Sequence, residues 1–381
     1  MIESGNLIYL LSKLVAFPSV TPDDAGSLDY ICNRLTPIGA KCQWVNHRDT
    51  KNVIITLGQG VTTLAFAGHV DVVPSGDLAR WYNGNPFELQ LIDDKLIGRG
   101  TADMKGGIAA FIIALEQFMV NHSHDLNSFK IMLLLTSDEE GSAIDGTPLI
   151  VKYLQEQGQV LDFCLIGEPS CVDVIGDTIK VGRRGSLTGE LKIFGKQGHI
   201  AYPHLCQNPI HAFAPALAEL TALVWDNGNQ YFPPTSFQFA NIKSGVGATN
   251  VIPGELSANF NLRYNNLQTV ASMQKQVADI LDNHQLHYQL EWNHSAAPFM
   301  TEVGELVKVA SESINRVCGI TPQLKTDGGP SDGRFLVAVS KEIIECGLRN
   351  DSIHQVNECT TSHDLLQLGK IYLDILDNIF K

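Results

Sequence analysis

The sequence predicts an α/β fold: a mixed, mostly parallel sheet covered by helices and interrupted by a smaller ferredoxin-like α+β domain. Three observations support this prediction. The chain has 381 residues, 44% of them hydrophobic, which is more than one ordinary core requires. Its first half alternates helix and strand patterns. A different order of elements follows before the alternation resumes.

Residues 1–179 show the alternation that builds a parallel sheet. Apolar residues at a helical spacing predict helices, and short apolar runs rich in branched residues predict strands. The expected helices span 6–16, 28–38, 108–119 and 148–156, and the expected strands span 53–57, 64–68, 130–136 and 163–167. Parallel strands joined in this way form a sheet with both faces covered.

Between residues 180 and 293 the order changes to strand, helix, strand, strand, helix, strand, which is the ferredoxin-like split unit. These elements are expected at 186–194, 209–224, 236–242, 256–263, 270–283 and 287–292. The α/β pattern resumes over a helix, a strand and a terminal helix, at 303–317, 343–346 and 364–380. We therefore predict one domain made of residues 1–179 and 294–381, with residues 180–293 inserted into it.

The composition excludes several classes of partner. A formal charge of −14 argues against nucleic acid or an anionic membrane, because phosphate groups need a basic surface. The apolar stretches reach about a dozen residues, short of the ~20 that a membrane helix requires. Glu3 precedes the apolar part of the N-terminus, which predicts an amphipathic helix and not a signal peptide. The eight cysteines contain no CxxC pair, so we expect reduced thiols in a cytoplasmic protein.

Five side chains of metal-binding type lie at the edges of predicted strands or glycine turns. They are His69, Asp103, Glu140, Glu168 and His354. The carboxyl ends of the strands are where open α/β sheets place their sites. The set therefore predicts a hydrolytic centre with two metal ions. Asp71 follows His69 two residues later, and we expect its carboxylate to hold the second ring nitrogen of that histidine.

The chemistry of amide hydrolysis explains these residue types. A bound metal ion lowers the pKa of water from 15.7 to about 7, and two ions about 3.5–4 Å apart need a bridging carboxylate. Mixed histidine and carboxylate ligands suit Zn²⁺, and Co²⁺ or Mn²⁺ would also be accepted. Glu139 precedes a ligand and could take the proton of the attacking water without binding a metal itself.

Four motifs resemble the aminoacylase and carboxypeptidase-type metallohydrolases, a likeness that extends over the whole chain. They are HVDVVP at 69–74, DMKG at 103–106, TSDEEG at 136–141 and GEPS at 167–170. The resemblance implies that Asp103 bridges two Zn²⁺ ions. It implies that His69 and Glu168 complete one ligand set, and that Glu140 and His354 complete the other.

The same resemblance assigns further roles in catalysis. It implies that Glu139 is the general base and acid, with Asp71 beside it in the catalytic set, and that the peptide bond from Asp103 to Met104 is cis. His199 is implied to contact the scissile carbonyl from a partner subunit. On this basis the inserted domain is a lid and dimerisation domain, the larger domain holds the metal ions, and the protein is a homodimer.

Further motifs resemble the branch of this family that removes succinate from N-succinyl-LL-2,6-diaminopimelate, giving LL-2,6-diaminopimelate for lysine and peptidoglycan precursors. They are GRRGS at 182–186, GKQGHIAYPH at 195–204, TNVIP at 249–253, SDGRF at 331–335 and SIHQVNE at 352–358. The resemblance implies a small N-succinyl amino acid as substrate. The residues implied to bind it are Arg183, Asn250, Arg263, Ser331 and Asn350.

Pro330 departs from the family, which has threonine at this position to help hold the succinyl group. Proline lacks both the hydroxyl and a backbone N–H. Another amidase of the family, an acetylornithine deacetylase or a metallodipeptidase, therefore stays an alternative. A second alternative is a metal-binding protein that has lost catalysis and acts as a structural or regulatory partner, but the intact Glu139 and ligand set argue against it.

Overall fold

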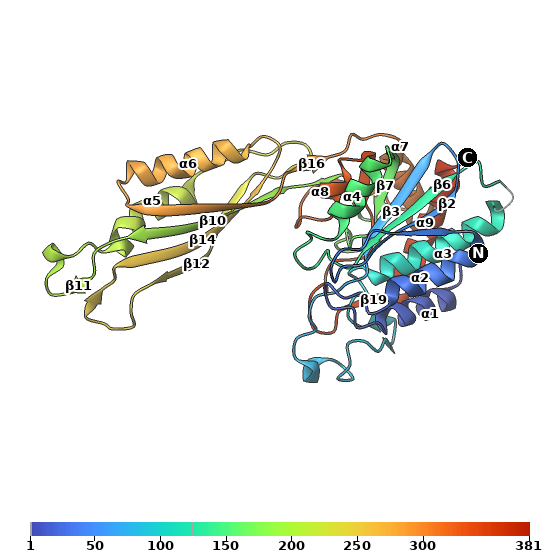
Figure 1. Ribbon diagram of the computed structural model, residues 1–381, viewed down its shortest axis with the longest axis horizontal. Coiled ribbons are helices and arrows are strands. Elements are labelled where there is room, and N and C mark those ends of the chain that lie inside the picture. Colours follow the sequence, from blue (N-terminus) through green and yellow to red (C-terminus); the bar gives the residue numbers. More distant parts are fainter. Residues whose placement is uncertain (1, 123–124) are drawn as a thin grey trace. The chain divides into compact units, whose positions relative to one another are not determined.

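The computed structural model describes residues 2–122 and 125–381, which form two compact units (Figure 1). Unit 1 comprises Met1–Gly182, Met300–Lys325 and Ser331–Lys381, and unit 2 comprises Arg183–Phe299 and Thr326–Pro330. The segment Thr326–Pro330 falls in the range that the sequence assigned to the larger domain. Within unit 2 this segment contacts Arg183, whose guanidinium donates a hydrogen bond to the carbonyl of Asp327, at 3.3 Å.

Unit 1 is built on an eight-stranded sheet with the order β1-β2-β6-β3-β7-β18-β8-β17. The strands are β1 (Lys41–Trp44), β2 (Asn52–Gly58), β3 (Thr63–His69), β6 (Lys130–Thr136), β7 (Leu161–Ile166), β8 (Thr178–Lys180), β17 (Gln323–Lys325) and β18 (Ser340–Glu345). The central strands β6, β3, β7 and β18 are parallel, whereas β1 and β2 pair antiparallel at one edge. The predicted mixed, mostly parallel sheet is confirmed.

Helices pack around this sheet. They are α1 (Ser4–Val15), α2 (Ser27–Leu35), α3 (Lys105–His122), α4 (Thr147–Glu156), α7 (Glu305–Cys318), α8 (Gly333–Leu336) and α9 (Ser362–Ile379), with short 3₁₀ turns η1 (Thr36–Ile38) and η2 (Leu78–Arg80). The helix α3 is buried along most of its length and packs against α1 and α9. No helix in the described part of the chain is long and apolar enough to cross a membrane.

A small antiparallel sheet in unit 1 was not expected from the sequence. It has the order β19-β5-β4, with β4 (Gln90–Ile92), β5 (Lys95–Ile97) and β19 (Cys359–Thr361). It joins the segment before Asp103 to the segment after His354, because Ile97 of β5 pairs with Cys359 of β19. Two regions far apart in the sequence are thereby held together.

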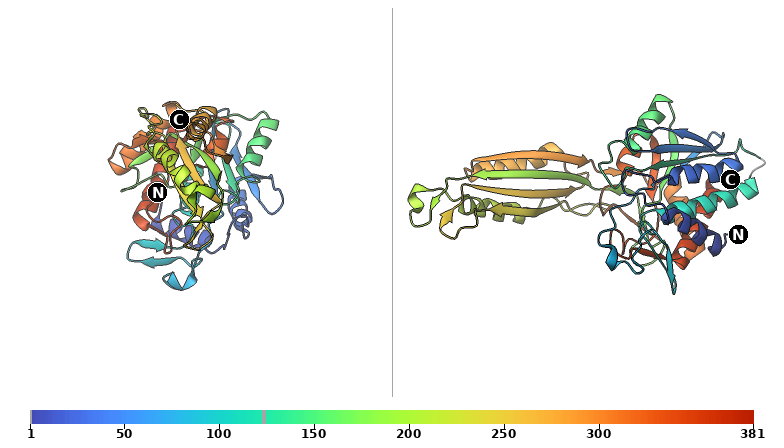
Figure 2. Two further views of the ribbon diagram at one scale, coloured as in Figure 1. Left: turned by 90° about the vertical axis from the view of Figure 1, so that its left-hand side faces the viewer. Right: turned by 60° about the horizontal axis from the view of Figure 1, so that its bottom comes forward.

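Unit 2 is an antiparallel sheet with the order β12-β14-β10-β15, packed against two helices. Its elements are β10 (Gly185–Phe194), α5 (Pro209–Ala222), β12 (Ser236–Ser244), β14 (Glu255–Tyr264), α6 (Val270–Asn283) and β15 (Tyr288–Ala296). Alternate residues of the strands, such as Leu187, Leu191 and Phe260, form its core with Phe213 and Val277 of the helices. The long strands lie side by side in Figure 2. The ferredoxin-like prediction is confirmed.

Two short strand pairings lie outside these sheets in the described part of the chain. The strand β11 (Gly198–His199) pairs with β13 (Val251–Ile252), close to the 3₁₀ turn η3 (Pro203–Leu205). The strand β9 (Gly182–Arg183) pairs with β16 (Phe299–Met300), where the chain enters and leaves the inserted region.

Candidate metal centre

The central parallel strands place three of the expected ligands at one edge of the sheet. His69 is the last residue of β3, and it pairs with Thr136 at the end of β6. Glu140 follows the end of β6, and Glu168 follows the end of β7. Because β6, β3 and β7 are neighbours, their carboxyl ends bring these side chains together. Sequence reasoning predicted this edge correctly.

The five expected ligands form two groups that share Asp103. Each group offers ligand atoms within 4.8 Å of one another: His69, Asp103 and Glu168 in one, and Asp103, Glu140 and His354 in the other. The Nε2 atom of His69 lies 3.3 Å from Oδ1 of Asp103 and 3.7 Å from Oε1 of Glu168. The Nε2 atom of His354 lies 3.3 Å from Oδ2 of Asp103 and 3.0 Å from Oε1 of Glu140. Each oxygen of Asp103 therefore faces a different histidine, which is how a bridging carboxylate is arranged.

Two buried atoms of this cluster fit a bound cation. Nε2 of His69 and Oδ1 of Asp103 are both buried, and neither has a hydrogen-bond partner among the described residues. Buried polar atoms in native proteins are normally satisfied. Nitrogen and carboxylate oxygen donors of this kind suit Zn²⁺ and similar divalent ions. The residues present therefore fit a metal site.

The pKa shifts in the cluster also fit a bound cation. The pKa of His354 is raised to about 10, because its ring is hydrogen-bonded to Asp103 and Glu140. Burial raises the pKa of Glu168, and the neighbouring carboxylates of Asp103 and Glu139 raise it further. Like charges that stand this close disfavour ionisation. A divalent cation would offset this repulsion.

Asp71 contacts the His69 ring, as expected, but through two of its groups. Nδ1 of His69 lies 2.9 Å from the backbone carbonyl of Asp71 and 3.5 Å from its carboxylate, so the carbonyl is the closer partner. The carboxylate also accepts hydrogen bonds from the backbone N–H groups of Glu139 and Glu140, both at 3.1 Å. Asp71 is fully buried. It therefore links the orientation of the His69 ring to the position of the Glu139-Glu140 turn.

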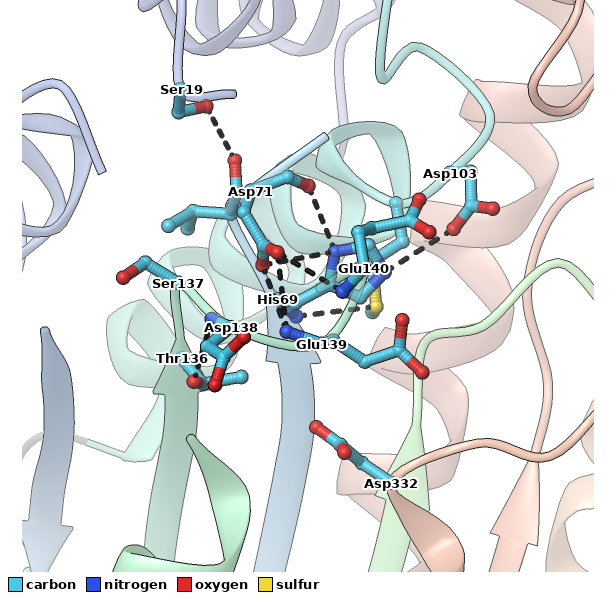
Figure 3. Close-up of polar contacts among 12 residues, drawn as sticks. Ser19, His69, Asp71, Asp103, Thr136, Ser137, Asp138, Glu139, Glu140 and Asp332 are labelled. Carbon is cyan, nitrogen blue, oxygen red and sulfur yellow. Dashed lines mark hydrogen bonds and ion pairs between the residues drawn. The ribbon is translucent and has the colours of Figure 1, made fainter. Parts of the chain in front are cut away.

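Glu139 and Glu140 are neighbours whose side chains diverge. Figure 3 shows them leaving adjacent backbone positions in different directions. Only Glu140 belongs to a group with Asp103, although Glu139 has a carboxylate oxygen close to both His69 and Glu140. Desolvation raises the pKa of Glu139, and the carboxylates of Asp332 and Glu140 add to the rise against the lowering effect of His69. Glu139 thus lies beside the ligands in a position suited to proton transfer.

Asp103 lies on a tight loop that leads directly into α3. The peptide bond from Asp103 to Met104 is cis, as the family resemblance implied. The sulfur of Met104 accepts a hydrogen bond from the backbone N–H of His69, at 3.4 Å. The loop and the end of β3 are therefore in direct contact.

Two expected substrate residues lie in unit 1. The hydroxyl of Ser331 is buried and donates a hydrogen bond to the carboxylate of Glu345. A substrate contact by Ser331 stays a prediction. The backbone N–H of Asn350 donates to the carbonyl of Cys171, at 3.0 Å, in a region where Asn350 is partly exposed. Its substrate contact also stays a prediction.

Two further expected residues, Arg183 and Arg263, lie at one end of unit 2. Arg263 of β14 pairs with Ser186 near the start of β10. Burial lowers the pKa of Arg263, and the nearby charge of Arg184 lowers it further. Arg183 packs against Gly328, where a Cβ would meet Nη1 of the guanidinium and would require it to shift. This end of unit 2 therefore gathers positive charge in a protein that is acidic overall.

His199 and Asn250 lie at the opposite end of the same unit. His199 belongs to β11, and the carbonyl of Asn250 accepts a hydrogen bond from Ile200, at 3.0 Å. Both residues are exposed. Phe194 lies eight residue steps along β10 from Ser186, which at a strand rise of ~3.3 Å per residue is roughly 25 Å. His199 therefore lies far from Arg183 and Arg263 within its own unit. Figure 1 shows β11 beyond one end of β10 and β14.

The sequence interpretation gave no role to Glu358 and Asp332, two buried acids beside the expected site. Glu358 accepts hydrogen bonds from the loop that carries Asp103. Asp332 accepts one from the hydroxyl of Thr147 at the start of α4, at 2.6 Å. The sequence motifs could have indicated both residues. Glu358 ends the motif at 352–358 that contains His354, and Asp332 directly follows Ser331.

Comparison with known proteins gives a consistent result. The family model of peptidase family M20/M25/M40 matches residues 65–378. Succinyl-diaminopimelate desuccinylase of Methylococcus capsulatus is 48% identical over 375 residues, covering 98% of this chain and 99% of that protein. The protein of the same name from Nitrosomonas europaea is 46% identical over 376 residues, covering 99% of each chain. The crystal structure of a tripeptidase from Staphylococcus aureus shares the fold, with a TM-score of 0.81 at 20% identity, covering 100% of this chain and 99% of that one.

Proposed function

Because the chain belongs to peptidase family M20/M25/M40, we propose that it is a metal-dependent amidohydrolase that removes succinate from N-succinyl-LL-2,6-diaminopimelate. The products are succinate and LL-2,6-diaminopimelate, a precursor of lysine and peptidoglycan. The observation that carries the chemistry is Asp103, whose two oxygens face two different histidines. The substrate rests on the two desuccinylases that match this chain over nearly its whole length.

The ligand chemistry favours two Zn²⁺ ions, with Co²⁺ or Mn²⁺ as substitutes. His69 and Glu168 would hold one ion, Glu140 and His354 the other, and Asp103 would contact both. When bound, the ions would acidify the attacking water and polarise the amide carbonyl. Asp71 would keep the His69 ring and the Glu139-Glu140 turn aligned with each other, because it contacts the ring through its carbonyl and the turn through its carboxylate.

Glu139 is the proposed general base and acid. Its carboxylate lies beside the ligands, and desolvation raises its pKa, which favours accepting a proton in the reaction. Glu139 would take a proton from the attacking water and deliver it to the nitrogen of the leaving amine. The oxygen of that water bonds to the amide carbonyl carbon, the carbon–nitrogen bond breaks, and the free amine and succinate are released.

The substrate carries several carboxylates, which suits the arginines of unit 2. Arginine binds carboxylate through two parallel hydrogen bonds. Arg183 and Arg263 are the proposed partners in unit 2, with Ser331 and Asn350 contributing from unit 1. Arg183 packs against the loop that ends at Pro330, so we assign the succinyl carboxylate to Arg183.

This assignment predicts a change in selectivity. Arg183→Ala should lower kcat/KM for the succinyl substrate by at least about tenfold more than for its acetyl analogue, which lacks the extra carboxylate. Arg183→Lys keeps the charge and loses the planar fork, so it should show an intermediate effect. Steady-state kinetics of both variants on both substrates give the ratio. Equal losses on the two substrates would show that Arg183 does not recognise the acyl group.

Hydrolysis assays test the proposed function directly. The purified protein, loaded with Zn²⁺ or Co²⁺, is given succinyl-diaminopimelate, acetylornithine and a dipeptide. We expect the highest kcat/KM on succinyl-diaminopimelate, and we expect a chelator to abolish it. Pro330 specifically favours the second candidate, another amidase of the family, and faster hydrolysis of acetylornithine or the dipeptide would establish that candidate. Metal binding without turnover of any of the three would contradict an enzymatic role.

We also propose that the enzyme is a homodimer and that His199 and Asn250 act on the partner subunit's substrate. Within one chain they lie roughly 25 Å along β10 from Arg183 and Arg263, too far for one small substrate to contact both ends. A second copy would remove this difficulty. The strand β12 lies at the edge of its sheet with most of its residues exposed, and such an edge is available for pairing.

The proposed location is the cytoplasm. All eight cysteines are free thiols, four of them buried, which is the usual state of cysteine in a reducing compartment. The biosynthetic role proposed above requires the same compartment as the other enzymes of amino-acid synthesis.

A further inference from the structure

Glu358 is a buried acid that binds the loop carrying Asp103. One carboxylate oxygen, Oε1, accepts hydrogen bonds from the backbone N–H groups of Ala102 and Asp103, both at 3.0 Å. The other, Oε2, accepts from the backbone N–H of Gly100 at 3.0 Å and from the guanidinium of Arg99 at 2.8 Å. Glu358 is 1% exposed. All four hydrogen bonds are assisted by its charge.

The same residue closes the loop that carries His354. Its backbone carbonyl accepts a hydrogen bond from Gly98, at 2.9 Å. The hydroxyl of Ser352 donates to the carbonyl of Cys359 at 2.7 Å and accepts from its N–H at 3.0 Å, so the ends of the loop are fastened together. His354 itself has a left-handed backbone, with φ of 61°. The position of His354 therefore depends on a short, tightly closed loop that ends at Glu358.

These contacts distinguish the two groups of ligands. Both groups share Asp103, but the other two ligands of the first group are held by the large sheet without Glu358: His69 ends β3 and Glu168 comes shortly after β7. Asp103 and His354 lie on two loops outside that sheet, and Glu358 is hydrogen-bonded to the first loop and terminates the second. The β5–β19 pairing and the hydrogen bond from Gly98 to the Glu358 carbonyl would still join the two loops without this side chain. Its removal would release the backbone of Asp103 itself from the link.

We propose that Glu358 is a positioning residue that sets the distance between Asp103 and His354 and thereby the affinity for the ion that these two residues share with Glu140. This inference rests on the two-metal site proposed above. Residues that orient metal ligands through hydrogen bonds typically change metal affinity 10–100-fold when replaced. Glu358 contacts neither the substrate nor the ion, and it acts through the backbone of Asp103.

Replacement by glutamine is the sharpest test. Glutamine has about the size of glutamate. In the native protein both carboxylate oxygens of Glu358 accept hydrogen bonds from backbone N–H groups, so the N–H₂ group of the glutamine must face at least one of these N–H groups. Two donors then oppose each other, and one side of the contact is lost. We expect Glu358→Gln to bind one metal ion about as the wild type does and the other about 10–100-fold more weakly.

The metal-free protein is titrated with Co²⁺ alone in a calorimeter. The absorption spectrum of the Co²⁺-loaded protein is then recorded. Glu342→Gln is the matched control. Glu342 also accepts backbone hydrogen bonds in unit 1, from Glu305 at 3.0 Å and Leu306 at 2.8 Å, but it contacts no loop that carries a ligand. Glu342→Gln should bind two Co²⁺ ions as the wild type does. The melting temperature of each metal-free variant records the purely structural effect of the substitution.

Each outcome decides the inference. Selective weakening of one ion in Glu358→Gln, with a melting temperature similar to that of Glu342→Gln, supports it. Wild-type affinity for both ions overturns it, and so does equal weakening of both ions together with a large fall in melting temperature. If Glu358→Gln does not fold, Glu358→Asp is measured in the same way, because it keeps the charge and is one methylene shorter. A wild-type protein that fails to bind two ions would instead contradict the proposed metal centre.

Discussion

Glu139→Ala should lower kcat by about two to four powers of ten, the range of general acid–base catalysis, while two metal ions remain bound. The reason is the division of labour in the Glu139-Glu140 turn. Glu140 contacts His354 at 3.0 Å and shares a ligand group with Asp103, whereas Glu139 lies close to His69 and Glu140 but in no group with Asp103. Loss of Glu139 therefore removes a proton carrier and leaves both proposed ligand sets complete.

Glu140→Ala is the matched control, one residue away on the same turn. We expect it to bind a single ion, because Asp103 and His354 alone form an incomplete site. Metal content by atomic emission and kcat are measured on both variants, with circular dichroism to confirm folding. The assignment of Glu139 is wrong if Glu139→Ala retains only one ion, or if it keeps most of the wild-type activity.

The second large effect concerns two inactive variants that restore each other. A donor to the carbonyl oxygen in the transition state typically contributes 10²–10³ in kcat, so His199→Ala should be almost inactive on its own. A mixed dimer of His199→Ala with Glu139→Ala should regain one complete site. The chain that keeps Glu139 receives His199 from its partner.

Random exchange gives half mixed dimers with one complete site each, so the mixture should reach about one quarter of the wild-type activity. The control mixes Glu139→Ala with the double variant Glu139→Ala, His199→Ala, where no site can be complete. Subunit exchange is followed independently by differently tagged chains. Exchange without recovery of activity would show that His199 acts within its own chain, and the dimer role of unit 2 would lose its main support.

Local patterns explain why much of the fold was predictable. The predicted strand at 130–136 and helix at 270–283 coincide with β6 and α6, because each is a continuous run with a clear period and a defined end. Thr269, for example, caps α6 through its side chain, together with Ser272. The short strands β8 and β17, of three residues each, carry no such pattern and were not predicted. They form because neighbouring strands offer them hydrogen bonds.

In the candidate site, too, some features could be predicted from the sequence and others could not. The sequence by itself determined the identity of the five proposed ligands and of Glu139, because residue type and motif order are local properties of the chain. Only the tertiary structure decided that the closer partner of the His69 ring is the carbonyl of Asp71, and that the Asp71 carboxylate holds the Glu139-Glu140 turn.

The structure alone also revealed Glu358, which is hydrogen-bonded to a loop more than 250 residues earlier in the chain. It placed His199, on the short β11–β13 pairing, and Arg263, on β14, at opposite ends of unit 2. The physical reason is common to these cases. Hydrogen-bond partners and distances between remote segments depend on how strands and loops pack together, whereas residue type and periodicity are already present in the unfolded sequence.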